Sequence, residues 1–100
     1  MVSIVIASFA DKVTQDLYDG TNSKEARIIP KQLWPIVARK LDMIGAAHML
    51  LDLSSPPGNR LEALKGKEKG LHSIRVNDQF RIVFRWAEGN AYDVQVTDYH

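Results

Sequence analysis

The sequence predicts an α+β domain with the element order β-α-α-β-β-β, in which helices cover one face of an antiparallel sheet. In the first half, apolar residues recur with the spacing of one helical face, at Leu33, Ile36, Val37, Leu41 and Ile44. From residue 72 onward, apolar and polar residues alternate instead, which indicates strands. The breaker Pro56-Pro57-Gly58-Asn59 separates the two patterns. Helices followed by a run of strands are typical of the α+β class.

The first two predicted elements are a strand and a short helix. Residues 2–7 are mostly β-branched and precede a polar segment, so we expect a strand there. Within residues 11–18, Val13 and Leu17 lie four positions apart, and Gly20 follows as a helix terminator. This pattern predicts a short helix that ends at the glycine.

The main helix is predicted over residues 31–44, after a polar loop or frayed helix at residues 21–27. Pro35 lies inside this predicted helix. Because proline is tolerated in a first helical turn, either the helix begins near Pro35 or an irregular turn precedes it. Residues 46–51 are expected to add one or two further turns.

The second half is predicted to form an antiparallel meander. Strands are expected at residues 72–76, 80–86 and 92–97, joined by turns at 77–78 and 88–90. The apolar face of such a sheet packs on the helices and leaves the other face in water. Side chains on the wet face are therefore the ones available to bind a ligand.

The composition is that of one globular domain spanning residues 1–100, long enough for a single core. The formal net charge is only +1, so bulk charge does not indicate nucleic-acid binding. The absence of cysteine excludes disulfides and thiolate metal sites. Residues 2–7 are too short to cross a bilayer and lack the basic lead-in of a secretory signal. We therefore expect a cytoplasmic protein without a membrane partner.

Positive charge is concentrated in the second half of the chain. Between residues 60 and 85 the acids are Glu62, Glu68 and Asp78, and the cations are Arg60, Lys65, Lys67, Lys69, Arg75, Arg81 and Arg85. Arg75, Arg81 and Arg85 share one strand phase, opposite the aromatic residues, so their guanidiniums are candidates for bidentate phosphate binding. The alternative is an ordinary solvated strand face.

The printed sequence ends in Asp98-Tyr99-His100, which adds a candidate acid–base group. Histidine has a pKa near neutrality and can take up and return a proton. The alternative is a terminal residue without a role. His48 is expected to be a partly buried helix residue and His72 a residue at the core edge. The spacing of the three histidines does not match a zinc site, so we expect no metal or cofactor.

Three separated motifs resemble the HigB toxins of bacterial toxin–antitoxin modules, which belong to the RelE superfamily and are also labelled plasmid maintenance killer proteins. The motifs are Pro-Pro-Gly-Asn-Arg-Leu-Glu-Ala-Leu-Lys-Gly at 56–66, Ser-Ile-Arg-Val-Asn-Asp-Gln-Phe-Arg-Ile-Val-Phe-Arg-Trp at 73–86, and Asp-Tyr-His at 98–100. They occur in the family's order. The resemblance implies a RelE-like fold, a curved antiparallel sheet backed by two to three helices, which agrees with the periodicity.

The resemblance also implies a function. Members of this family are ribosome-dependent mRNA endonucleases that enter the ribosomal A site, cut the codon there and arrest translation. Their partner is a helix-turn-helix antitoxin that neutralises the toxin and represses the operon, so contact with operator DNA is expected only through the antitoxin. Two alternatives are open: a protein that blocks the ribosome without cutting, and a degenerate toxin that serves as a co-repressor.

Residue by residue, the resemblance assigns the catalytic arginine to Arg81 and the lysine before glycine to Lys65. It assigns the terminal pair to Tyr99 and His100. Some members carry a histidine three residues before the lysine, where this sequence has Glu62. Glu62 is therefore expected to act as a base or to orient Lys65 or Arg81. The remaining cations expected to bind RNA are Arg60, Arg75, Arg85, Lys67 and Lys69.

Overall fold

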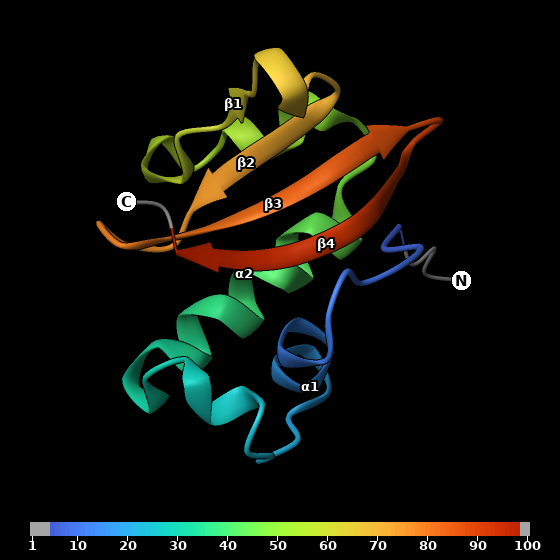
Figure 1. Ribbon diagram of the computed structural model, residues 1–100. Coiled ribbons are helices and arrows are strands. Elements are labelled where there is room, and N and C mark those ends of the chain that lie inside the picture. Colours follow the sequence, from blue (N-terminus) through green and yellow to red (C-terminus); the bar gives the residue numbers. More distant parts are fainter. Residues whose placement is uncertain (1–4, 99–100) are drawn as a thin grey trace.

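The computed structural model describes residues 5–98 of the chain. It contains the helices α1 (Lys12–Asp19) and α2 (Trp34–Ala46) and a four-stranded antiparallel sheet in the order β1-β2-β3-β4 (Figure 1). The strands are β1 (Glu62–Ala63), β2 (Leu71–Arg75), β3 (Phe80–Ala87) and β4 (Asn90–Asp98). The α+β class and the meander of the last three strands are confirmed.

Both predicted helices are confirmed, although α2 begins three residues later and ends two residues later than predicted. The side chain of Asp11 caps α1 by accepting a hydrogen bond of 2.9 Å from the backbone nitrogen of Thr14. Gly20 ends α1 in the left-handed region, at φ 77°. A 3-10 turn, Lys31–Leu33, precedes α2, and Pro35 lies in the first turn of α2, so both expectations for the proline hold.

The core lies between α2 and one face of the sheet. Val37, Leu41 and Ile44 of α2 and Ile74, Ile82 and Phe84 of the sheet are all 0% exposed. Each such side chain contributes about 1.5–3 kcal/mol by leaving water. Because successive strand residues point to opposite faces, this core turns the residues between them toward the other face of the sheet.

The predicted first strand differs from the structure. Of that segment, residues 2–4 lie outside the described part, and the following residues make only isolated parallel bridges to β4, Ile6 to Ala91 and Phe9 to Val94. The pairing between β3 and β4 is irregular at Val83/Arg85, and Asp93 has φ 53°. This bulge interrupts the edge of β4 along which the N-terminal segment would have to pair to form a continuous strand.

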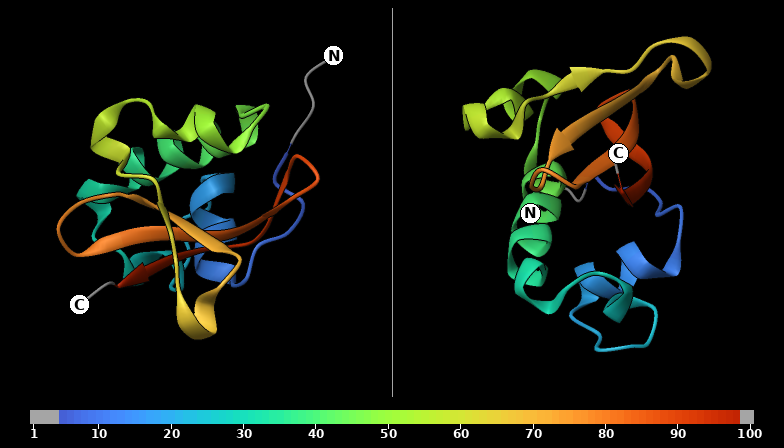
Figure 2. Two further views of the ribbon diagram at one scale, coloured as in Figure 1. Left: turned by 90° about the horizontal axis from the view of Figure 1, so that it is seen from above. Right: turned by 60° about the vertical axis from the view of Figure 1, so that its left-hand side comes forward.

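The segment between α2 and the sheet also departs from expectation. The predicted turns at 46–51 are replaced by the 3-10 helix Leu50–Ser54, followed by a second 3-10 turn, Pro57–Asn59. The segment lies beside α2 and leads to the β1 edge of the sheet (Figure 2). The short strand β1 was not predicted. Within residues 5–98, no helix combines the length and the apolar character needed to cross a bilayer.

Candidate active site

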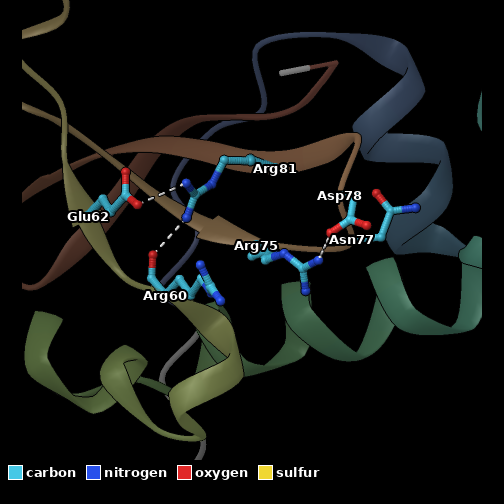
Figure 3. Close-up of a pocket in the computed structure, with 6 residues that line it drawn as sticks. All are labelled: Arg60, Glu62, Arg75, Asn77, Asp78 and Arg81. Atoms are coloured by element: carbon cyan, nitrogen blue, oxygen red, sulfur yellow. Dashed lines mark hydrogen bonds and ion pairs between the residues drawn. The ribbon is translucent and has the colours of Figure 1, made fainter. Parts of the chain in front are cut away.

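A pocket of about 160 Å³ opens where β1, β2 and β3 meet the turn between β2 and β3 (Figure 3). Its lining residues are Arg60, Glu62, Arg75, Asn77, Asp78 and Arg81. Three arginines against two carboxylates leave the pocket net positive. The pocket thus gathers side chains from both of the first two sequence motifs.

Arg81 is the most enclosed cation of the pocket. Residue Arg81 is 9% exposed. Its Nη2 donates a hydrogen bond of 2.7 Å to the carbonyl oxygen of Arg60, and its Nη1 lies 3.2 Å from Oε1 of Glu62 (Figure 3). These contacts fix the direction of a planar guanidinium, a shape that matches the oxygens of a phosphate. The carboxylate of Glu62 is therefore in contact with Arg81, and its role as a base or as an orienting residue stays a prediction.

Arg75 of β2 lies directly opposite Arg81 on the neighbouring strand β3, because the two residues are partners in the β2–β3 register. The Arg75 guanidinium also pairs with the carboxylate of Asp78 in the turn. The side chain of Asn77 shapes that turn by accepting hydrogen bonds from the backbone nitrogens of Gln79, at 2.9 Å, and Phe80, at 2.7 Å. The turn thus fixes the start of β3 at Phe80, and Arg81 is the next residue of that strand.

Two pocket residues were missed by the sequence reasoning. Asn77 and Asp78 were interpreted only as a turn, although a turn that joins two arginine-bearing strands must lie next to the arginines. The position of Asp78, three residues after Arg75, was the available signal.

Arg85 lies outside the pocket, so two of the three strand arginines, Arg75 and Arg81, come together there. Its guanidinium lies 4.7 Å from the centre of the Tyr92 ring and 3.6 Å from Oδ2 of Asp93. Arg85 lies four positions after Arg81 along β3, a span of about 13 Å at about 3.3 Å per residue. The bulge beside Val83 further changes the direction of the strand.

The three lysines of the basic segment are exposed and are not among the pocket's lining residues. Lys65 directly precedes the 3-10 turn Gly66–Glu68, and Lys67 and Lys69 lie in and after that turn. Lys65 is three residues from Glu62 along the chain. The catalytic role that the resemblance assigns to Lys65 stays a prediction.

Tyr99 and His100 lie outside the described residues. The last described residue, Asp98, pairs with Phe80, which directly precedes Arg81. Its Oδ2 accepts a hydrogen bond of 3.1 Å from Nε2 of Gln79. The described end of β4 is thus anchored next to the strand that carries Arg81.

The other two histidines take no part in the pocket. His72 is half-buried, with its ring 6.1 Å from that of Phe84, and burial lowers its pKa, as expected at a core edge. His48 is exposed, contrary to expectation, because α2 ends at Ala46. Among residues 5–98, no group of three histidine or carboxylate side chains could hold a metal ion.

Comparison with solved structures identifies the fold. One chain of a YoeB-YefM complex from Staphylococcus aureus is similar, with a TM-score of 0.52 and 15% identity, over 95% of this chain and 97% of that one. The two chains therefore belong to the same fold class.

Sequence comparison narrows this class to one family. The sequence model of the family described as "RelE-like toxin of type II toxin-antitoxin system HigB" matches residues 7–100. Toxin HigB-1 of Vibrio cholerae serotype O1 is 43% identical over 83 residues, 83% of this chain and 85% of that protein. An uncharacterized protein of Haemophilus influenzae is 45% identical over 83 residues, 83% of this chain and 77% of that protein. The chain belongs to the HigB-like toxin family.

Proposed function

We propose that this toxin is a ribosome-dependent endoribonuclease that cuts mRNA in the ribosomal A site and so arrests translation. The observation that carries the proposal is the geometry of Arg81. A nearly buried guanidinium, aimed by the Arg60 carbonyl and by Glu62, faces a net-positive pocket. Such a preorganised cation stabilises negative charge that develops on a phosphoryl group.

The proposed reaction is internal attack by the RNA itself. The 2′-oxygen of the ribose forms a bond to the neighbouring phosphorus, and the bond from phosphorus to the 5′-oxygen breaks. The products are a 2′,3′-cyclic phosphate and a 5′-hydroxyl. A base removes the 2′ proton and an acid protonates the leaving oxygen. Arg81 and Lys65 stabilise the developing charge, and Arg75 holds the phosphate. The reaction needs no metal, because RNA carries its own nucleophile and these cations supply the positive field.

His100 is the favoured acid or base, with Tyr99 or Glu62 as its partner. This assignment rests on the family resemblance and on chain connectivity. Two residues beyond Asp98 span up to about 7 Å of backbone, and Asp98 pairs with the residue before Arg81. The described end of β4 thus lies beside the strand that carries Arg81. Arg60, Arg85, Lys67 and Lys69 are proposed to bind RNA outside the reacting phosphate.

The proposal includes the partners of a type II toxin. A helix-turn-helix antitoxin neutralises the toxin in the cytoplasm, and operator DNA is contacted only through that antitoxin. The solved structure that this chain resembles is a YoeB-YefM complex, which supports a protein partner for this toxin.

Induction in growing bacteria tests the proposed function. Wild-type toxin and the variant His100→Ala are induced, and mRNA ends are mapped by primer extension. His48→Ala is the matched control, because His48 is exposed and lies outside the pocket. Growth arrest with discrete cuts at A-site codons is expected for wild type and His48→Ala, and neither for His100→Ala. Full toxicity of His100→Ala would overturn the role of His100.

The same experiment separates the alternatives. Growth arrest with uncut message would replace the endonuclease with a protein that blocks the ribosome. Absence of toxicity, with operator binding intact in the complex with the antitoxin, would indicate a co-repressor.

A further inference from the structure

A buried polar contact between Lys40 and Asn59 joins α2 to the segment that leads to β1. Lys40 of α2 is 7% exposed, and Asn59 is 0% exposed. The Lys40 ammonium donates a hydrogen bond to Oδ1 of Asn59. Neither residue lines the pocket.

The amide of Asn59 also organises its own segment. Its Nδ2 donates to the carbonyl oxygens of Leu53, at 3.1 Å, and Ser55, at 3.3 Å, and lies 3.8 Å from the sulfur of Met43. One side chain therefore holds residues 53–59 in a compact form and ties them to α2. Both ends of the Asn59 amide are used in this way.

Burying the charged Lys40 ammonium in this contact costs free energy. Burial lowers the pKa of Lys40, and repulsion from Arg39 and Arg75 lowers it further. An apolar pair of similar volume is often equally or more stable than buried ionic groups.

The geometry leads directly to Arg81. Asn59 ends the 3-10 turn, and the backbone of Arg60 follows in the left-handed region at φ 46°. The backbone nitrogen of Arg60 donates a hydrogen bond of 3.1 Å to the carbonyl oxygen of Pro57. The Arg60 carbonyl then accepts the hydrogen bond from Arg81. Glu62, the second partner of Arg81, follows two residues later. Two groups that contact the Arg81 guanidinium thus come from the segment directly after Asn59.

We propose that Lys40 and Asn59 are positioning residues, which fix the Arg60 carbonyl and Glu62 and thereby aim the Arg81 guanidinium at the reacting phosphate. This role rests on the proposed RNA cleavage. A displacement of the guanidinium by about 1 Å is enough to lower the rate about 100-fold. Lys40 and Asn59 act only through Arg60 and Glu62 and do not touch RNA.

Single-turnover cleavage of mRNA on programmed ribosomes tests the proposal. The variants are Lys40→Met, Asn59→Ala and the double variant. The control is Thr14→Val, which removes a different buried hydrogen bond, that of 2.9 Å from the Val96 nitrogen to Oγ1 of Thr14. We expect Lys40→Met and Asn59→Ala to lower the maximal rate about 10- to 100-fold, with the half-saturating ribosome concentration unchanged. The double variant should lose no more than the worse single variant, because both act through one contact.

A second readout does not depend on activity. Nitrogen-15 NMR of the Arg81 guanidinium reports whether its Nη groups are held, as the bond to the Arg60 carbonyl requires. Separate Nη signals are expected in wild type and Thr14→Val, and averaged signals in Lys40→Met and Asn59→Ala. If wild type does not cleave RNA, the proposed function fails, and the NMR comparison alone decides whether the contact positions Arg81. Arg81 signals in Lys40→Met and Asn59→Ala that match those of Thr14→Val would overturn the inference.

Discussion

Replacing Glu62 with glutamine distinguishes the two roles open to this carboxylate, a base in the reaction or a residue that orients Arg81. Glutamine has nearly the same shape and keeps an acceptor oxygen for the guanidinium. It cannot take up the 2′ proton. The two roles therefore predict cleavage rates of different magnitude.

The expected magnitude follows from the contact. Oε1 of Glu62 lies 3.2 Å from Nη1 of Arg81, and the Glu62 side chain is 52% exposed. A half-exposed ion pair contributes about 0.5–1 kcal/mol, because solvent screens it. If all of that is lost in the transition state, the rate falls about two- to five-fold. Removal of a general base would instead lower the rate about 100- to 10,000-fold.

The assay is single-turnover cleavage of mRNA on programmed ribosomes with Glu62→Gln, and Arg81→Lys is measured beside it. Lysine cannot contact both the Arg60 carbonyl and Glu62 with a fixed fork, so Arg81→Lys should lose about 100-fold or more. A loss greater than about 100-fold for Glu62→Gln, with the fold intact, would refute the orienting role and make Glu62 the base.

Three further predictions concern the rest of the molecule. Burial lowers the pKa of His72 below its ordinary 6.5, so the folded state disfavours the protonated ring. The free energy of unfolding should therefore fall as the pH drops from 6.5 through the lowered pKa. The variant His72→Gln should flatten this pH dependence in denaturation curves. Arg85→Ala should weaken binding to single-stranded RNA and reduce the slope of log K against log salt by about 0.7, while the maximal cleavage rate is unchanged. Leu41→Ala, in the fully buried part of α2, should lower the free energy of unfolding by about 2–5 kcal/mol in urea titrations, and a loss below about 1 kcal/mol would contradict the packing.

Local signals were enough to predict most of the elements. The spacing of Val13 and Leu17, the terminator Gly20 and the alternation along β3 are encoded within a few residues of each element. By contrast, β1 has two residues, too few for any periodicity. The segment from residue 5 to residue 10 has the composition of a strand, but its pairing depends on the bulge at Asp93 of β4, which is far away in the sequence.

The candidate site was predictable only in part. Arg75 and Arg81 were correctly expected on one face, because the turn between them sets the register. The separation of Arg85 from them depends on strand length and on the bulge, which the alternation does not reveal. The partners of Arg81 are about twenty residues away along the chain, beyond any local pattern. Tyr99 and His100 stay predictions from the family resemblance.

The contact between Lys40 and Asn59 had a signal that was not used. Lys40 lies three residues after Val37 and four before Ile44, so it falls on the apolar stripe of the main helix. A lysine in that phase must either reach solvent or find a buried partner. The identity of that partner could not be read from the sequence, because Asn59 belongs to an irregular segment.

The chemistry of the cut ends tests most directly whether the pocket around Arg81 cleaves RNA by internal attack. Purified toxin is mixed with programmed ribosomes, and the 3′ end of the upstream fragment is analysed. The account predicts a 2′,3′-cyclic phosphate for wild type, no product when the 2′-hydroxyls of the codon are replaced by hydrogen, and almost none for folded Arg81→Ala. A 3′-hydroxyl end, or cutting of the deoxy codon, would contradict it.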